Sequence, residues 1–171
     1  MRKRIAILLG AAVVLSAAIL LRTGRGPEPT WTTDETPVAV SDGGGTVTWA
    51  LVPDALTASS AGLRIDNVSG DVLHYDHLPI LQVLRDGTWR TMRPAGDVQT
   101  PTEDYRLASG ESVTLAERWD DLYGELPDGT YRLIRTFYRG EELPAARENA
   151  VSVVLLTFRC ENGKAAVVPE Q

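Results

Sequence analysis

Two histidines and two aspartates lie close together in the sequence and are the first residues to consider for metal chemistry. His74 and His77 are the only histidines in the chain, and Asp71 and Asp76 lie beside them. If Tyr75 lies in a β-strand, residues 74 and 77 point to opposite faces, although a bent loop would let them converge. A closed zinc site needs four ligands and outer hydrogen bonds that orient them. We therefore predict solvent-exposed loop histidines and no metal site.

Three pairs of adjacent carboxylates are the next candidates: Glu103-Asp104, Asp120-Asp121 and Glu141-Glu142. None has the alternating oxygen ligands and glycine of a calcium loop, so solvated turns are the simpler interpretation. The Gly-x-Ser-x-Gly and Ser-x-x-Lys signatures of hydrolases are absent, and no cysteine and histidine stand at a plausible catalytic spacing. The sequence therefore predicts no enzymatic activity and no cofactor.

Cys160 is the only cysteine, so the chain has no internal disulfide. It follows residues 151–158, which are apolar apart from a serine and a threonine. The thiol is either buried and inert or paired with another chain, and the apolar surroundings favour the inert state. Its position near the C-terminus also excludes a lipoprotein signal, which needs a cysteine directly after the N-terminal apolar run.

Residues 1–25 form an export or anchoring segment, either a signal anchor or a signal peptide. Residues 5–21 are apolar apart from Gly10 and Ser16, and basic residues flank them on both sides. A helix of this length spans about 26 Å, slightly less than the ~30 Å core of a bilayer. Retention in the cell membrane is favoured, with the C-terminal domain outside because the preceding charges are positive. Cleavage and secretion is the alternative.

The exported part is strongly acidic. Of the 17 basic residues, five lie in the first 25 positions, which leaves 12 basic against 23 acidic residues and a formal net charge of −11. Such a surface repels phosphate backbones and anionic lipids, so the sequence predicts no nucleic-acid partner. Solubility is the simplest interpretation of this charge.

Residues 26–45 are predicted to form a flexible linker between the membrane segment and the domain. They contain several prolines, threonines and acidic residues and the triplet Gly43-Gly44-Gly45, and they show no sustained periodicity. Trp31 is an exception in this composition. It either rests in the membrane interface or packs on the domain.

Residues 46–171 are predicted to form one domain made of seven to eight strands. Short apolar alternations recur about every ten residues, and no segment has the pattern of a long helix. The predicted strands include residues 46–51, 63–66, 80–85, 88–92, 113–115, 131–138 and 151–158. One-turn helical pieces are expected at residues 118–123 and 144–149. Regular short strands without intervening helices favour an all-β, antiparallel β-sandwich, preceded by one N-terminal hydrophobic helix.

The separators between these strands are typical turn sequences, in which glycine is expected at positive φ. They are Asn67-Val68-Ser69-Gly70, Asp86-Gly87, Ser109-Gly110, Asp128-Gly129, Arg139-Gly140 and Asn162-Gly163. The run at residues 151–158 is apolar on both faces, unlike the alternating strand at residues 63–66. It is therefore predicted to lie in the interior of its sheet.

The most specific local pattern surrounds Tyr131. Pro127 and Gly129 provide a tight bend just before it, and in immunoglobulin-type sandwiches a tyrosine at this point turns its hydroxyl back onto upstream backbone. We predict this structural corner for Tyr131, with an ordinary strand tyrosine as the alternative.

Several sequence segments, taken with this corner, resemble bacterial immunoglobulin-like domains of exported, membrane-anchored proteins over roughly residues 46–158. The segments are residues 63–67 with Ser69-Gly70, residues 84–89, Leu107 with residues 109–112, and residues 122–124. The resemblance implies an immunoglobulin-like sandwich, and its motifs are structural rather than catalytic. The inter-sheet cysteine pair of antibody domains is absent, and Trp89 follows a turn instead of preceding it.

Two functions remain compatible with the sequence. The favoured one is a non-catalytic extracytoplasmic interaction module that binds a protein or a cell-wall polymer. Trp119 and Tyr123 are its candidate contact residues, although the favoured explanation for both is that they fill the end of the sandwich. The alternative is an accessory or sensor subunit that regulates a membrane partner protein.

Overall fold

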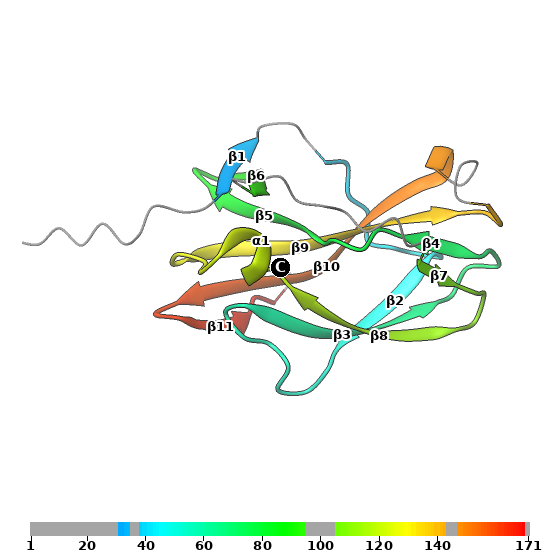
Figure 1. Ribbon diagram of the computed structural model, residues 1–171, viewed down its shortest axis with the longest axis horizontal. Helices are drawn as coiled ribbons and strands as arrows, with labels where there is room; N and C mark the ends of the chain where they lie inside the picture. The colour runs from blue at the N-terminus through cyan, green and yellow to red at the C-terminus, as the bar shows by residue number, and fades with distance from the viewer. Residues whose placement is uncertain (1–30, 35–37, 95–104, 143–146, 170–171) are drawn as a thin grey trace, which may run out of the picture.

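Two antiparallel β-sheets stacked face to face make up the described part of the protein (Figure 1). The computed structural model describes residues 31–34, 38–94, 105–142 and 147–169. The strands of the larger sheet are β1 (Trp31–Asp34), β4 (Leu73–Tyr75), β5 (Ile80–Arg85), β6 (Thr88–Pro94), β7 (Tyr105–Leu107), β9 (Gly129–Arg139), β10 (Ala150–Glu161) and β11 (Lys164–Val167). Those of the smaller sheet are β2 (Val47–Leu51), β3 (Ser60–Asn67) and β8 (Ser112–Arg118). The helical pieces are α1 (Asp120–Tyr123) and the 3₁₀ turn η1 (Arg147–Asn149).

The strand order shows which strands lie inside each sheet. The larger sheet runs β1-β6-β5-β9-β10-β11, and β4 joins the same sheet by pairing with both β9 and β7. The smaller sheet runs β2-β3-β8. β10 pairs with β9 along most of its length, whereas β11 pairs only with its last four residues, Phe158 to Glu161. The prediction that the apolar run at residues 151–158 is an interior strand was therefore wrong for most of the run, whose other side has, among the described residues, only the isolated bridge from Ser41 to Val153.

The core lies between the two sheets and follows from alternation along the strands. Leu63 and Ile65 of β3 are fully buried, and so are Leu133 and Phe137 of β9 in the opposite sheet. Residues two apart in a strand point to the same face, and β3 buries every second side chain in this way. The long strand β9 therefore determines much of what lies at the centre of the molecule.

Two of the predicted turns are tight hairpins. Asp86 and Gly87 connect β5 to β6 with φ angles of 50° and 76°, and Asn162 and Gly163 connect β10 to β11 with 51° and 72°. Positive φ at both central residues is the geometry that matches the twist of the flanking strands. The prediction of positive φ was wrong for Gly70, because its φ angle is not positive.

All seven predicted strands are present, and they correspond to β2, β3, β5, β6, β8, β9 and β10. The predicted total of seven to eight was wrong, because eleven strands occur in the described ranges. The four unpredicted strands, β1, β4, β7 and β11, have only three or four residues each. Such short segments hold too few residues for an alternating pattern to stand out.

The predicted linker at residues 26–45 is partly folded onto the domain, which corrects the domain boundary expected at residue 46. Trp31–Asp34 forms the edge strand β1 against β6, and Ser41 makes an isolated parallel bridge with Val153. Trp31 is buried, so of the two alternatives for this residue the structure shows packing on the domain. A strand that pairs with an open sheet edge does so through backbone hydrogen bonds, which require no particular pattern of side chains. The composition of this segment therefore did not predict the strand.

Gly43 shows how closely this segment packs on the sheets. Its φ is +72°, and a Cβ placed there would lie 2.9 Å from Val153 Cγ1 and 3.0 Å from the Trp49 ring. Both the backbone conformation and the contact distance therefore require glycine. The glycine triplet is part of the folded domain rather than a flexible spacer.

The predicted N-terminal hydrophobic helix lies outside the described residues. Within residues 31–34, 38–94, 105–142 and 147–169, no helix has the length and apolar character needed to cross a membrane.

Candidate functional site

The corner predicted at Tyr131 is present at the start of β9. The Tyr131 hydroxyl donates a hydrogen bond of 2.7 Å to the Pro127 carbonyl oxygen, four residues upstream. Burial of the side chain raises the pKa of Tyr131 to about 12. The prediction of positive φ at Gly129 was wrong. A Cβ placed on Gly129 would lie 3.3 Å from the Tyr131 ring. A side chain at this position would have to displace the tyrosine ring, which folds back over it, by a few tenths of an ångström.

Replacing Tyr131 with phenylalanine is expected to lower the free energy of unfolding by about 1–2 kcal/mol, because the Pro127 carbonyl loses its partner while the ring keeps its packing. Urea denaturation measures this change. Tyr138→Phe is the matched control, since its hydroxyl bonds the exposed Asp76 carboxylate at 2.6 Å and water can replace it. Equal losses in the two variants would contradict a special role for the corner.

Trp119 and Tyr123, the candidate contact residues, are buried with 0% and 4% exposure. Trp119 donates its indole N–H to the Ala58 carbonyl oxygen over 2.8 Å, and its ring stacks on Phe158 with centroids 5.0 Å apart. Phe158 in turn stacks on Tyr131 at 5.7 Å. Their assignment as exposed contact groups is therefore corrected: both residues fill the interior, as the alternative had it.

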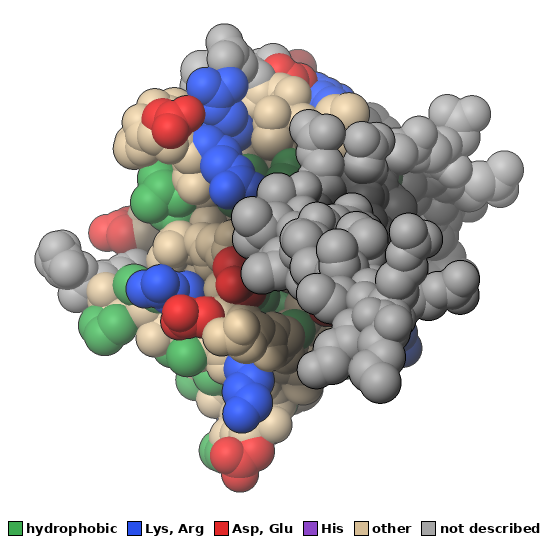
Figure 2. All heavy atoms as spheres, turned by 90° about the vertical axis from the view of Figure 1, so that its left-hand side faces the viewer, with side chains coloured by type: hydrophobic (Ala, Val, Ile, Leu, Met, Phe, Trp, Pro, Cys, Tyr) green, Lys and Arg blue, Asp and Glu red, His purple; other side chains and the backbone are tan. Residues whose placement is uncertain are grey.

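The part of this end of the sandwich that is coloured in Figure 2 has a mixed surface. Figure 2 shows basic and acidic side chains interspersed with small hydrophobic patches where the coloured residues are visible. The exposed large hydrophobic residues in the described ranges are Val40, Val68 and Val167, and none is aromatic. The described residues therefore show no exposed aromatic patch.

The two histidines do not form a pair. His74 lies in β4 with 2% exposure, and its Nε2 is 3.0 Å from the Gly140 carbonyl oxygen, so its prediction as a solvent-exposed loop residue was wrong. His77 is exposed and its ring stacks on Tyr105 at 5.3 Å. In the described part of the chain, no three His, Cys, Asp or Glu side chains come together as metal ligands.

The carboxylate pairs are distributed separately. Asp120 and Asp121 begin α1, and both form ion pairs with Arg118, which lowers the pKa of Asp120 through the hydrogen bond from that guanidinium. Glu141 pairs with Arg106 on the surface. Glu103 and Asp104 lie outside the described residues.

Cys160 is buried near the end of β10. Desolvation raises the pKa of its thiol from 9.0 to about 11, with Asp128 adding to the effect. A thiol that stays protonated and covered is a poor nucleophile, as the inert interpretation requires.

At pH 8, Cys160 is expected to react with iodoacetamide about 100-fold or more slowly in the native protein than in urea. The same shift links the thiol to stability. Between pH 9 and pH 11 the unfolded thiol loses its proton while the native thiol keeps it, so the free energy of unfolding falls as the pH rises. Mass spectrometry after timed quenching measures the reaction, and equal rates in the two states would contradict burial.

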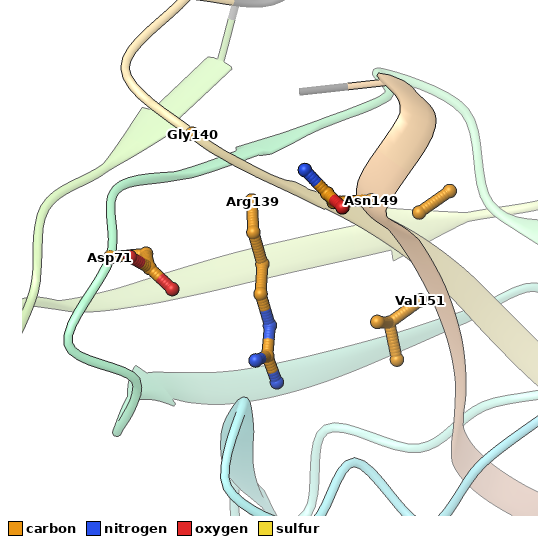
Figure 3. Close-up of a pocket in the computed structure, with 6 residues that line it drawn as sticks. Asp71, Arg139, Gly140, Asn149 and Val151 are labelled. Carbon is orange, nitrogen blue, oxygen red and sulfur yellow. The ribbon is translucent and has the colours of Figure 1, made fainter. Parts of the chain in front are cut away.

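The strand β9 finishes at Arg139, at the end opposite the Tyr131 corner. An open hollow of about 600 Å³ lies there, and Figure 3 shows the residues that line it. Arg139 and Gly140 line it together with Asp71, Asn149 and the first two residues of β10. The Arg139 side chain extends into the hollow, and the Asp71 side chain faces it from the other side (Figure 3). We call this hollow the Arg139 site.

The two charged groups of the Arg139 site are held by different contacts. Arg139 Nη2 donates to the hydroxyl of the buried Thr46, whereas its Nε is buried without a hydrogen-bond partner. The backbone of Asp71 is fixed by Asn67 Nδ2, which donates to its carbonyl at 2.9 Å, and by Ser69 Oγ, which accepts from its N–H at 3.3 Å. Arg139 and Asp71 face each other without forming an ion pair within 4.0 Å. The arrangement offers a cation and an anion to the same space.

A second polar cluster lies between the sheets. Arg135 of β9 donates from Nε to Glu117 Oε1 of β8 over 2.8 Å and from Nη2 to Glu117 Oε2, and both side chains are 3% exposed. Arg135 Nη1 also donates to the carbonyl oxygen of Asp76. The Arg135 guanidinium lies 5.6 Å from the Tyr75 ring centroid. This is a fully bonded pair that joins the two sheets.

Sequence reasoning missed Arg135, Arg139 and Glu117. The signal was present, because residues 131, 133, 135, 137 and 139 share one face of β9, and that face carries Tyr131 and Phe137 into the core. An arginine at a core-facing position must find an acceptor or a route to solvent. Arg135 finds Glu117, and Arg139 reaches the hollow.

The family of the chain follows from its sequence match together with this topology. The bacterial Ig-like domain family matches residues 48–151, which is more than half of the chain and runs from β2 to the start of β10. No curated protein and no solved structure gives a significant match. The smaller sheet β2-β3-β8 and the β6-β5-β9-β10 part of the larger one correspond to strands A-B-E and C′-C-F-G of an immunoglobulin sandwich, with the tyrosine corner at the start of F. The chain therefore belongs to the bacterial Ig-like domain family.

Proposed function

We propose that the protein is a non-catalytic extracytoplasmic interaction module, held at the cell membrane by residues 5–21, that binds a protein or a cell-wall component. The apolar N-terminal run and the acidic charge of the rest of the chain support its location. Membership in a family of Ig-like domains, whose members are typically non-catalytic, supports a binding role.

The Arg139 site is the observation that carries this proposal. Its volume of about 600 Å³ falls in the ~300–1,000 Å³ range of ligand sites. It lies where the segment from residue 67 to residue 71 meets the ends of β9 and η1, and binding residues are disproportionately found on connections that a rigid scaffold positions. Arg139 Nη1 has no hydrogen-bond partner among the described residues and is available there for a partner.

Photo-crosslinking in intact cells tests this function. Benzoylphenylalanine at Asn149, on the rim of the Arg139 site, is expected to give crosslinked adducts of the full-length protein. The same residue at the exposed Lys164, which follows the β10–β11 turn at the opposite end, is the matched control. Adducts at Lys164 and none at Asn149 would contradict the proposal.

The identity of the captured material also decides between the two functions left open by the sequence. Wall polymer or a soluble protein supports the interaction module. A membrane kinase, transporter or peptidase would favour an accessory subunit instead. Recovery of the natural chain from cytosol alone would contradict the proposed location.

A further inference from the structure

We propose that the Arg139 site binds the free carboxylate at the end of a peptide chain, together with the last amide N–H of that peptide. This inference rests on the proposed function, because it assigns a ligand class to the same hollow. It is built from three polar side chains, those of Arg139, Asp71 and Asn149, and from the apolar side chain of Val151.

Arg139 is the group that would receive the carboxylate. Strand pairing fixes the backbone of Arg139, which lies opposite Leu73 in the β4–β9 pair. The N–H of the next residue, Gly140, donates to the Val72 carbonyl oxygen over 3.0 Å. Thr46 accepts one hydrogen of Nη2 and Nε is buried, so the two Nη1 hydrogens and the second Nη2 hydrogen are the donors that remain for an acceptor inside the hollow. A guanidinium is a planar fork of donors that matches the two oxygens of a carboxylate.

Asp71 supplies the complementary acceptor. Its carboxylate faces Arg139 across the hollow and forms no hydrogen bond with the described residues, whereas its backbone is fixed through Asn67 and Ser69. A ligand that places an anion on Arg139 and an N–H donor a few bonds away would satisfy both groups. The last residue of a peptide has this combination, and Asn149 at the rim can donate to the preceding carbonyl oxygen.

The charge of the site argues against a phosphate ligand. A phosphate dianion on Arg139 would lie close to the Asp71 carboxylate and would enter a domain with a formal net charge of −11 from residue 26 onward. The terminal carboxylate of a peptide carries only one negative charge, and the neighbouring amide N–H of the peptide would donate to the Asp71 carboxylate and offset its charge. Val151 leaves one apolar wall for a small terminal side chain.

Two sources present this terminal chemistry: the C-terminus of a protein, with L-residues, and wall peptides that end in D-residues. N-acetyl-alanyl-alanine in its L,L and D,D forms is therefore the probe, titrated into the full-length protein in detergent and followed by ligand-observed saturation-transfer NMR. The better-binding stereoisomer names the source, and the carboxamide of each peptide is the control ligand.

The free acid is expected to bind at least about tenfold more tightly than its carboxamide, because a charge-assisted hydrogen bond is lost in the amide. Arg139→Lys keeps the charge but loses the fork, and it should weaken binding about tenfold. Arg159→Lys is the matched control, since this exposed arginine lies on β10 toward the opposite end and should leave binding unchanged. Asn149→Ala, at an exposed position, should weaken binding about threefold without unfolding the domain.

Equal binding of acid and carboxamide, or unchanged binding in both Arg139→Lys and Asn149→Ala, would overturn the inference. Its failure is distinguishable from failure of the proposed function. Adducts at Asn149 with no response to either peptide would refute the ligand class and leave the interaction module in place. Absence of adducts and of peptide binding would refute both.

Discussion

Glu117→Ala is expected to lower the free energy of unfolding by about 3–5 kcal/mol, because it leaves the Arg135 guanidinium charged and buried with only the Asp76 carbonyl as acceptor. Both partners are 3% exposed, so the guanidinium left behind is largely withdrawn from water. The loss arises from the uncompensated charge rather than from the attraction within the pair. Urea denaturation of the purified protein, with the midpoint and the slope reported together, measures it.

An exposed ion pair provides the control for this prediction. Glu161 lies 3.7 Å from Arg159 with both side chains about 60% exposed, so Glu161→Ala should cost less than about 1 kcal/mol. Replacing both partners, Glu117→Leu with Arg135→Met, should recover much of the loss, since apolar residues of similar size remove the buried charge. A Glu117→Ala loss no larger than that of Glu161→Ala would show that the pair is not shielded from water.

Trp119→Ala is expected to lower the free energy of unfolding by about 3–5 kcal/mol. Trp119 is completely buried at the start of α1 and stacks on Phe158, which also stacks on Tyr131. Its removal opens a large cavity in the aromatic stack that joins α1, β10 and the corner of β9. It also removes the hydrogen bond to the Ala58 carbonyl oxygen. Thermal and urea denaturation are the measurements.

Trp49→Ala is the matched control, because this tryptophan lies in the edge strand β2 and is only partly buried. It should cost markedly less than Trp119→Ala, in proportion to the smaller area withdrawn from water. The pair of variants also tests the corrected assignment. A Trp119 variant that keeps its stability but loses crosslinked adducts would return Trp119 to the role of contact residue.

The long strands illustrate what pattern predicts well. Leu63 and Ile65 in β3 alternate with Arg64 and Asp66, and their burial was expected from that alternation alone. The corner at Tyr131 was predicted because Pro127 and Gly129 constrain the backbone within a few residues of it. In each case the interaction that determines the structure lies within one segment, so its sequence contains the information.

His74 and Trp31 illustrate the reverse. Nothing near His74 in the sequence indicates that Gly140, 66 residues later, supplies the carbonyl oxygen beside its ring. Trp31 lies in a segment without periodicity, and its burial depends on the free edge of β6. Contacts of this kind are set by which strands become neighbours, and strand order is not encoded in local alternation.

The amino-acid sequence by itself determined the class of the domain, most of its long strands, its hairpin turns and its tyrosine corner, because hydrophobic alternation and turn chemistry act over a few residues. Only the tertiary structure decided that Trp119 and Tyr123 are interior, that Arg135 meets Glu117, and that Arg139 faces Asp71 across a hollow. The physical reason is that a buried charge or an open cavity arises from side chains of distant strands. Their positions are set only when the two sheets pack together.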